Sequence, residues 1–343
     1  MTQTYRIALD AMGGDLGCSP AVTAAVEALE VYSDIELILV GPEDVLRDEL
    51  ARQKKTLSDR LTIHHASQVV TMDEPPAHAL KKKKDSSMRV SINLVKEGEA
   101  DACISSGNTG ALMATARFVL KMLPGVDRPA ITATFPSKRG HTHILDLGAN
   151  VDSSADQLYQ FAVMGSELAT AVDETDSPTV GLLNIGHEAI KGNGLVKEAD
   201  SQLRQSDLNY IGYVEGDDLF VGDVDVVVCD GFVGNVALKS SEGVAKLIAS
   251  YIKEEFTRNF LTRIVGLLAL PILARMRRRA DPRRYNGASL LGLRGIVIKS
   301  HGGSDSVAFG NAIKIARIEA IKNIQQQISE HIEQTLKQRY DEA

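Results

Sequence analysis

The sequence predicts a three-layer α/β/α fold of the Rossmann-like type, with a mainly parallel sheet covered by helices on both faces. Two observations predict it. Short apolar runs typical of buried strands alternate along the chain with longer helix-forming segments. Many of these runs end in small turns rich in glycine, asparagine and serine, directly before helix-forming sequence. Turns of this kind are typical of the carboxyl ends of parallel strands, where open α/β sheets bind ligands.

The alternation begins at the N-terminus. Arg6–Leu9 is apolar enough for a buried strand, and Ser19-Pro20 supplies an N-cap and a proline at the start of the following helix. Gly41-Pro42 ends the next strand, and Asp85-Ser86-Ser87 caps a helix that runs to about residue 97. The other elements expected here are strands at 35–40, 61–65, 102–104, 130–135 and 142–147, and helices at 21–32, 43–54, 111–122 and 153–172.

The second half repeats the pattern until one segment interrupts it. We expect strands at 179–184, 209–214, 225–229 and 296–298, helices at 195–205 and 236–255, and a long kinked helix over about 304–338. Between 256 and 286, apolar and arginine-rich helical sequence is inserted before the last strand. No Gly/Ser-rich or Pro-rich linker divides the chain. We therefore expect a single catalytic domain over 1–343 with a protruding helical excursion at 256–286.

The composition excludes several functional classes. Of the 343 residues, 44% are hydrophobic and 24% charged, as in ordinary globular proteins. A net charge of −7, the absence of tryptophan and only 5% aromatic residues argue against nucleic-acid binding. No apolar leader precedes the first strand, so we expect a cytoplasmic protein. The longest apolar stretch, Ile264–Leu273, is too short to span a bilayer and contains Pro271.

Neither a metal nor another cofactor is expected from the motifs. Cys18, Cys103 and Cys229 are widely spaced and match no zinc pattern, and we expect them to be reduced thiols. The chain has no HExxH, EF-hand or CxxC pattern, and we expect no paired-histidine site.

Two segments of the first half favour an anionic group such as phosphate. The turn Ser105-Ser-Gly-Asn-Thr-Gly110 follows a strand and opens a helix, so hydroxyls, an amide and two glycines meet a helix N-terminus. The alternative is a tight turn with an N-cap. Lys84 ends a lysine run before a helix start, which is either a solvated loop or a site for phosphate or an acidic partner. The candidates for binding substrate here are Ser105, Gly107, Asn108, Thr109, Gly110, Lys84, Ser86 and Ser87.

The first turn, Asp10-Ala-Met-Gly-Gly-Asp15, is neither a Walker A loop nor a G-x-G-x-x-G turn. Asp10 and Asp15 either orient a base, bind a pantetheine amide, or cap a helix. We count Asp10, Gly14 and Asp15 among the candidates for substrate binding.

Four later turns carry the remaining reactive side chains. Lys191 is placed to polarise a carbonyl or hold phosphate, and Asn193 to donate into an oxyanion hole. His301 is a candidate acid or base, or else a turn histidine bonded to backbone. Asp230 ends the strand at 225–229. The catalytic candidates are thus Lys191, Asn193, Asp230 and His301, and the further binding candidates are Asn150, Asn184, Asn235 and Ser304.

The segment 257–294 contains nine arginines and one acid, Asp281, beside many apolar residues. This combination is typical of a surface for anionic lipid headgroups or an acidic protein. The alternative is a helical dimer interface with solvated arginines. The residues expected to contact a carrier protein or a membrane are Arg263, Leu267, Leu268, Arg275, Arg277, Arg278 and Arg279.

Taken together, the segments resemble the bacterial phosphate acyltransferase family of phospholipid synthesis. The matching stretches are ALDAMGGD (8–15), KKKDSSMRV (82–90), SSGNTGALM (105–113), LDLGANVD (145–152), LLNIGHEAIKGN (182–193), VVVCDGFVGNVALK (226–239) and YNGASLLGLRGIVIKSHG (285–302). They occur in order over nearly the whole chain. The sequence departs from the family pattern at His187, where glutamate is common, and at Ser106, where alanine is common.

This resemblance implies a cytoplasmic homodimer with a fold similar to phosphate acetyltransferases and isopropylmalate dehydrogenases. It implies transfer of a long-chain acyl group from acyl carrier protein to inorganic phosphate, without a cofactor. A membrane glycerol-3-phosphate acyltransferase would consume the acyl phosphate. Two rival functions are an isopropylmalate-type dehydrogenase, for which nucleotide and metal residues are lacking, and a non-catalytic scaffold that docks acyl carrier protein at the membrane.

Overall fold

All the strands of this computed structural model, which describes residues 3–279 and 281–341, form one mixed sheet of eleven strands. The strand order is β3-β2-β1-β4-β11-β10-β5-β6-β9-β7-β8. The strands are β1 (Tyr5–Asp10), β2 (Ile35–Gly41), β3 (Leu61–His65), β4 (Ala102–Ser105), β5 (Ala130–Ser137), β6 (Gly140–Leu145), β7 (Val180–Leu183), β8 (Tyr210–Val214), β9 (Val226–Val228), β10 (Ala288–Leu291) and β11 (Ile296–Lys299).

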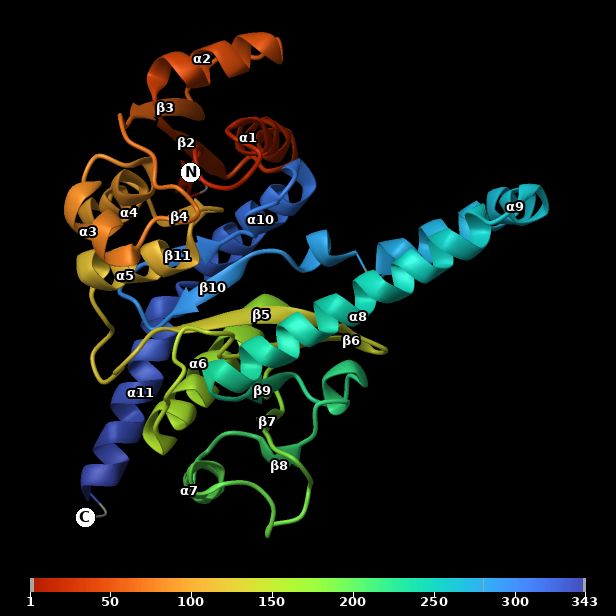
Figure 1. The fold of residues 1–343 in the computed structure, drawn as a ribbon. Helices are drawn as coiled ribbons and strands as arrows, with labels where there is room; N and C mark the ends of the chain where they lie inside the picture. The colour runs from red at the N-terminus through yellow and green to blue at the C-terminus, as the bar shows by residue number, and fades with distance from the viewer. Residues whose placement is uncertain (1–2, 280, 342–343) are drawn as a thin grey trace.

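Helices cover both faces of this sheet, as the sequence predicts (Figure 1). Around the first half, α1 and α10 pack together on one face, and α4 and α5 lie on the other. Around the second half, α6 packs against β6 and β9 and is flanked by α7 and α11. The helices are α1 (Ser19–Val31), α2 (Glu43–Arg52), α3 (Pro76–Lys82), α4 (Ser87–Glu97), α5 (Thr109–Leu120), α6 (Ala155–Asp173), α7 (Gly194–Leu203), α8 (Gly231–Thr257), α9 (Phe260–Arg279), α10 (Ser306–Lys322) and α11 (Ile324–Asp341), with 3-10 turns η1 (Asp218–Phe220) and η2 (Pro282–Tyr285).

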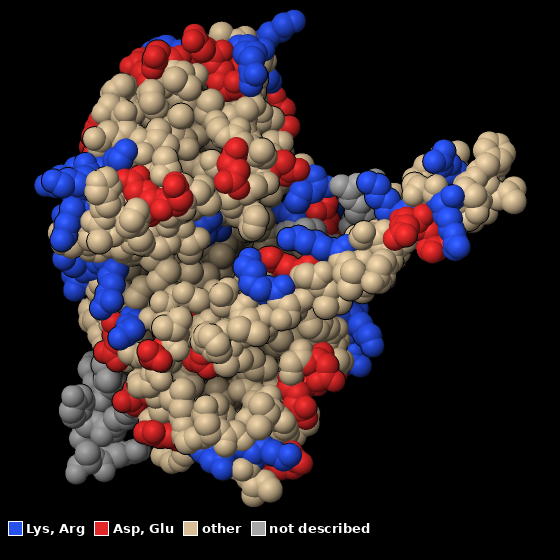
Figure 2. Space-filling view, in the orientation of Figure 1, with Lys and Arg blue, Asp and Glu red and all other residues tan. Residues whose placement is uncertain are grey.

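The sheet consists of two parallel sets joined by an antiparallel seam. β3, β2, β1, β4 and β11 are mutually parallel, as are β6, β9, β7 and β8, whereas the β11–β10, β10–β5 and β5–β6 pairs are antiparallel. The two sets therefore run in opposite directions. A twist of roughly 20–25° per strand step amounts to about 120–150° between β1 and β9, which turns both sets of carboxyl ends toward a common side. Figure 2 shows the surface hollowed between the two halves, above α8.

The structure differs from the sequence expectations at four elements. β10 was not expected, because its four residues directly follow the turn at Asn286-Gly287 and show no periodicity of their own. Part of the lysine run is helical, in α3. α8 begins at Gly231, directly behind its N-cap Asp230, rather than at 236. The expected long C-terminal helix is two helices, since Asn323 adopts a left-handed conformation (φ 50°) between α10 and α11.

α8 and α9 form an arm that projects from the body (Figure 1). The two helices pack against each other, with the Phe256 ring close to Gly266. Figure 2 shows uncharged stretches along the arm, interrupted by groups of acidic and basic residues. Its exposed apolar residues include Tyr251, Phe260, Leu261, Val265, Leu267, Leu268, Leu270 and Ile272. Among the described residues, no helix is long and apolar enough to cross a membrane.

The three cysteines have no disulfide partner, as expected. Cys103 and Cys229 are buried in strand or turn positions beside the core, and burial raises the pKa of both thiols above the ordinary range. Such thiols are poor nucleophiles, since the reactive species is the thiolate.

Candidate active site

Three turns meet at the carboxyl ends of β1, β4 and β11. The Asp15 N–H donates to the Gly302 carbonyl (2.9 Å), and the Ser106 hydroxyl donates to the Gly13 carbonyl (2.7 Å). Gly14 has φ +90°, and a Cβ there would lie 2.7 Å from the Gly302 oxygen. Only glycine fits this position without strain. The turns at 10–15, 105–110 and 300–304 therefore lie side by side at this edge of the sheet.

A row of three polar side chains crosses these strands. Asp10 pairs in register with Ser105, and Ser105 with Lys299, so the three side chains share one face of the sheet. The Ser105 hydroxyl donates to Asp10 Oδ2 (2.5 Å) and accepts the N–H of Gly107 (3.1 Å). Ser87, at the start of α4, also bonds to the Asp10 carboxylate. Ser105 therefore fixes the shape of the 105–110 turn by accepting the Gly107 N–H, and its hydroxyl proton is already donated to Asp10.

Asp10 and Lys299 are both buried. The Asp10 Oδ1 atom has no hydrogen-bond partner among the described residues, and burial raises the pKa of this carboxyl. The Lys299 ammonium donates to the Ser106 carbonyl (3.4 Å) and to the Ser300 carbonyl. No carboxylate of the described residues forms an ion pair with it. Burial lowers the pKa of Lys299 to about 8, while Asp10 and Asp15 oppose this effect.

Buried charges in proteins are normally paired, because leaving an ionised group unpaired away from water is costly. A buried ammonium held only by carbonyl groups is therefore a place where an anion gains much from binding. Lys299 is not among the site residues predicted from the sequence. The sequence feature that could have indicated Lys299 is the single charge at the end of the apolar strand Ile296–Ile298, directly before the His301 turn.

The neighbouring start of α5 offers further donors. Asn108 caps α5 by accepting the N–H of Ala111 (3.0 Å), and its amide donates to the Met72 (2.7 Å) and Glu74 (3.1 Å) carbonyls. Asn108 is thus engaged in the fold. Thr109 and Gly110 are exposed in the first turn of α5, where backbone N–H groups lack intrahelical partners. These N–H groups can hold an anion beside the turn.

Ser304 and His301 complete this edge. The Ser300 hydroxyl donates to Ser304 Oγ (2.8 Å), and Asn286 donates to Ser300. His301 is exposed, and its Nδ1 accepts the N–H of Gly303 (3.1 Å). A neutral His301 therefore carries its proton on Nε2, which leaves that atom available to a bound molecule. Beside these turns, a crevice lined by Gly13, Leu16, Ser106, Gly302, Ser304 and residues of α1 and α10 has no room for a water molecule.

A second cluster forms at the carboxyl ends of β6, β9 and β7. The buried Asp146 accepts backbone N–H groups of Ile131, Ala149 and Asn150, and the Asn150 amide. The N–H of Gly231 donates to the Asn150 carbonyl (2.8 Å). Asn235, an exposed residue of α8, lies against Gly148. Asn150 therefore has a structural role here, whereas Asn235 faces outward from the turn.

Two of the four predicted catalytic residues cap helices. Asp230 caps α8 by accepting the N–H groups of Phe232 (3.0 Å) and Val233 (3.1 Å). Asn193 caps α7 by accepting the N–H of Val196 (2.9 Å), which leaves its amide group outside that bond. Asn184 is buried and donates to Gly186 (3.1 Å). Lys191 is exposed in the same loop.

The structure does not join the two clusters by direct bonds. Within the described part of the chain, no hydrogen bond or ion pair links the 184–193 loop to the turns at 10–15, 105–110 or 299–304. His187 bonds to the Tyr213 carbonyl (3.0 Å) and lies near Glu215 and Asp218. Lys84 is exposed in the short connection between α3 and α4.

The residues predicted to contact a carrier protein or membrane lie on the arm. Arg263, Leu267, Leu268 and Arg275 are exposed on α9. Arg277, Arg278 and Arg279 end the same helix, but their side chains lie outside the described residues.

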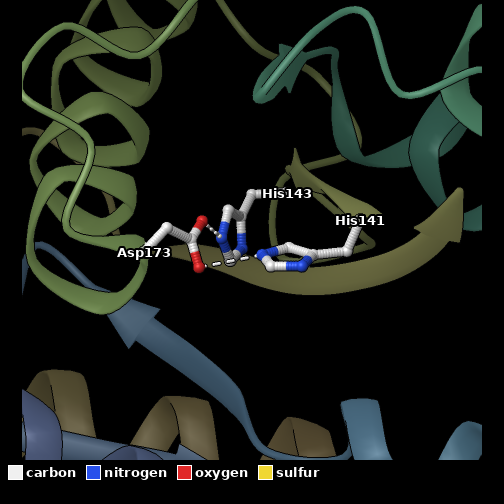
Figure 3. Close-up of side chains that lie close together, drawn as sticks. All are labelled: His141, His143 and Asp173. Carbon is white, nitrogen blue, oxygen red and sulfur yellow. Dashed lines mark hydrogen bonds and ion pairs between the residues drawn. The ribbon is translucent and has the colours of Figure 1, made fainter. Parts of the chain in front are cut away.

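One expectation is wrong: two histidines do form a pair. His141 and His143 of β6 approach Asp173 at the end of α6 (Figure 3). The pattern His-Thr-His in a strand was the sign, because alternate residues share a face of the sheet.

Known proteins resemble this chain over its full length. The model of the family described as "Fatty acid synthesis protein" matches residues 5–328. A phosphate acyltransferase of Nitrosococcus oceani is 62% identical over 330 residues, covering 96% of this chain and 97% of that protein. A phosphate acyltransferase of Alkalilimnicola ehrlichii is 61% identical over 336 residues, covering 98% of both.

Among solved structures, a phosphotransacetylase from Streptococcus pyogenes aligns with a TM-score of 0.63 at 18% identity, covering 93% of this chain and 94% of that chain. A phosphotransacetylase from Staphylococcus aureus aligns with a TM-score of 0.61 at 16% identity, covering 92% and 94%. These likenesses confirm the predicted fold.

Proposed function

The chain belongs to the phosphate acyltransferase family, and on that premise we propose that it transfers a long-chain fatty acyl group from acyl carrier protein to inorganic phosphate. The product is an acyl phosphate for phospholipid synthesis. The observation that supports this function best is the buried Lys299 ammonium, which has no anionic partner beside the 105–110 turn. That position suits a phosphate, whose charge would complete the pairing.

The reaction needs one displacement. A phosphate oxygen attacks the thioester carbonyl carbon, the carbonyl becomes a tetrahedral oxyanion, and the C–S bond then breaks to release the carrier-protein thiolate, which takes up a proton. Phosphate is itself the nucleophile, so no acyl-enzyme is required. The protein's contribution is to position the two reactants and to stabilise the developing charge.

We assign phosphate to the 105–110 turn, with Lys299 beneath it and Lys191 assisting from the opposite loop. The free amide groups of Asn193 and Asn235 bind the carbonyl or the pantetheine arm. Either His301 or Asp230 manages the proton on phosphate or on the leaving thiolate. The bonding pattern favours His301, because Asp230 already accepts two backbone N–H groups as a helix cap.

We further propose that the α8–α9 arm contacts the larger partners of the chain, namely the carrier protein or the membrane. Its apolar residues, such as Leu267 and Leu268, stand exposed next to Arg263 and Arg275. Apolar surface flanked by cations suits an acidic carrier protein or the anionic face of a membrane. A homodimer that buries part of the arm is compatible with either contact. We expect the protein in the cytoplasm, at times bound peripherally to the membrane near a glycerol-3-phosphate acyltransferase.

The test is direct. Purified protein is incubated with palmitoyl-acyl carrier protein with and without phosphate, and free thiol and acyl phosphate are both followed. Phosphate-dependent release of the two products in equal amounts supports the proposal. Carrier-protein binding without product release would instead favour the docking scaffold, and oxidation of a 2-hydroxy acid with a nicotinamide cofactor would favour the dehydrogenase.

A further inference from the structure

Three metal-binding side chains converge away from the candidate active site. His141 Nε2 lies 2.9 Å from Asp173 Oδ1, and His143 Nε2 lies 2.7 Å from Asp173 Oδ2 (Figure 3). One donor atom from each residue lies within 4.8 Å of the other two. Each histidine thus faces the same carboxylate through the same ring nitrogen.

The backbone fixes this convergence. His141 and His143 are alternate residues of β6 and project from one face of the sheet. Asp173 is the last residue of α6, which packs across β6. The His143 side chain is almost fully buried, whereas His141 is one third exposed. One side of the cluster is therefore rigid and the other is open to solvent.

A second layer of contacts supports the buried histidine. Thr134 stands opposite His143 in the β5–β6 ladder, and its hydroxyl lies 3.1 Å from His143 Nδ1. Histidines that bind metals commonly use their second ring nitrogen for such a bond, which fixes the tautomer and the ring orientation. Within the described residues, no lysine or arginine forms an ion pair with Asp173. Among these residues the carboxylate is therefore held by the two histidines, with which it forms ion pairs when they are protonated.

We propose that His141, His143 and Asp173 bind one zinc ion. Two imidazoles and one carboxylate favour zinc or a similar transition metal over magnesium or calcium, which prefer oxygen ligands. Tetrahedral zinc places its ligand atoms roughly 3.3 Å apart. The two Nε2–Oδ contacts, at 2.9 and 2.7 Å, would lengthen by a few tenths of an ångström, and the donor atoms, now all within 4.8 Å of one another, would have to settle at that spacing. Water on the exposed side of His141 supplies the fourth ligand.

Binding requires the protons on the two Nε2 atoms to leave. A neutral imidazole moves its proton from Nε2 to Nδ1, while a charged imidazole releases one proton to solvent. The His143 Nδ1–H then donates to the Thr134 hydroxyl oxygen. No oxidation or reduction takes place, and the two hydrogen bonds to Asp173 are replaced by three bonds to the metal.

The position assigns this ion a structural role. His141 and His143 lie in the amino-terminal part of β6, whereas Asp146 and the second cluster of turns follow its carboxyl end. The metal would fasten the end of α6 to the strand. Acyl transfer should therefore persist after the ion is removed, and the metal site and the proposed function can fail independently.

The experiment titrates the full chain, stripped with a chelator, with Zn²⁺ by calorimetry and with Co²⁺ by visible absorption. We expect one equivalent to bind with tetrahedral Co²⁺ bands, and Zn²⁺ to raise the melting temperature. His141→Gln and His143→Gln should each weaken binding by more than about 10-fold, and Thr134→Val by about 10-fold.

His331→Gln is the matched control, because His331 also contacts carboxylates but belongs to no potential metal-binding group found within the described residues. It should leave the binding unchanged. Absence of stoichiometric binding to the wild-type chain would overturn the proposal, as would binding that persists unchanged in His141→Gln. Because His141 is partly exposed, its replacement should leave the fold intact, so a loss of binding in this variant would not reflect misfolding.

Discussion

Replacing Lys299 with methionine should make the protein more stable and less able to use phosphate. Methionine is an unbranched side chain one atom shorter than lysine, and it removes the charge. The ordinary pKa of lysine is 10.5, and that of Lys299 is about 8. At about 1.4 kcal/mol per factor of ten in the equilibrium constant, keeping this ammonium charged in the folded protein costs about 3 kcal/mol.

This cost depends on pH with a definite sign. The unfolded chain holds the Lys299 proton up to about pH 10.5, and the folded chain holds it only up to about pH 8. Between these values the unfolded state binds more protons, so the stability of the wild type rises with pH. Below pH 8 the Lys299→Met variant should gain up to about 3 kcal/mol, less the loss of bonds to two carbonyls, and the gain should vanish above pH 10.5.

The effect on phosphate runs the other way. A hydrogen bond to a charged group contributes about 1.5–3 kcal/mol, so losing it should raise the KM for phosphate roughly 10- to 100-fold. The assay measures initial rates against phosphate concentration at a fixed concentration of palmitoyl-acyl carrier protein. Denaturant unfolding at pH 7 and pH 10 measures the stability of the same proteins. Lys299→Arg should retain much of the phosphate affinity, and Lys314→Met, on the exposed face of α10, should change neither quantity. A folded Lys299→Met protein with an unaltered KM for phosphate would refute the reasoning.

Three other outcomes are expected. Lys191→Ala should cut turnover sharply without lowering the melting temperature, since Lys191 is exposed, and near-normal turnover would remove its assigned role. Gly14→Ala should lower stability by at least about 1–3 kcal/mol in thermal unfolding, because its φ is positive and the new Cβ would meet the Gly302 carbonyl; an unchanged melting temperature would contradict this. Burial raises the pKa of Glu319 from an ordinary 4.5 to about 7. Between these pH values the folded state binds more protons than the unfolded state, so the stability of the wild type falls as the pH rises from 4.5 to 7. Glu319→Gln should therefore be more stable by up to about 3 kcal/mol at pH 8 and by little below pH 4.5, and equal gains at both would speak against the mechanism.

The periodicity of the sequence predicted most of the strands and helices correctly, because long apolar runs and capping residues act locally. β10 escaped this reasoning, since its four residues become a strand only through pairing with β5 and β11. The direction of the strands in the second half of the sheet depends on β10, so no local sequence pattern could predict that direction.

The candidate site was predictable in outline and not in detail. Glycine-rich turns indicated which segments meet, and Asp10, Ser105 and Ser304 do lie together. Asn108 and Asp230 looked like ligands, but each caps a helix, and a capping side chain has the same chemistry as a binding one. The row that contains Lys299 arises from strand register, which the order of residues along the chain does not reveal.

The antiparallel seam also has a mechanical consequence. β10 pairs with β5 and with β11 through only two residue pairs each, whereas β1 and β2 share six. Leu290 and Ile131 belong to the same buried apolar cluster across this seam, so side-chain packing contributes much of what joins the halves. Packed apolar side chains can slide past one another, whereas a long ladder of backbone hydrogen bonds between strands resists bending. Because Lys299 is paired directly with Ala288 of β10, any flexing of the two halves about β10 would change the surroundings of its ammonium group before those of more distant residues.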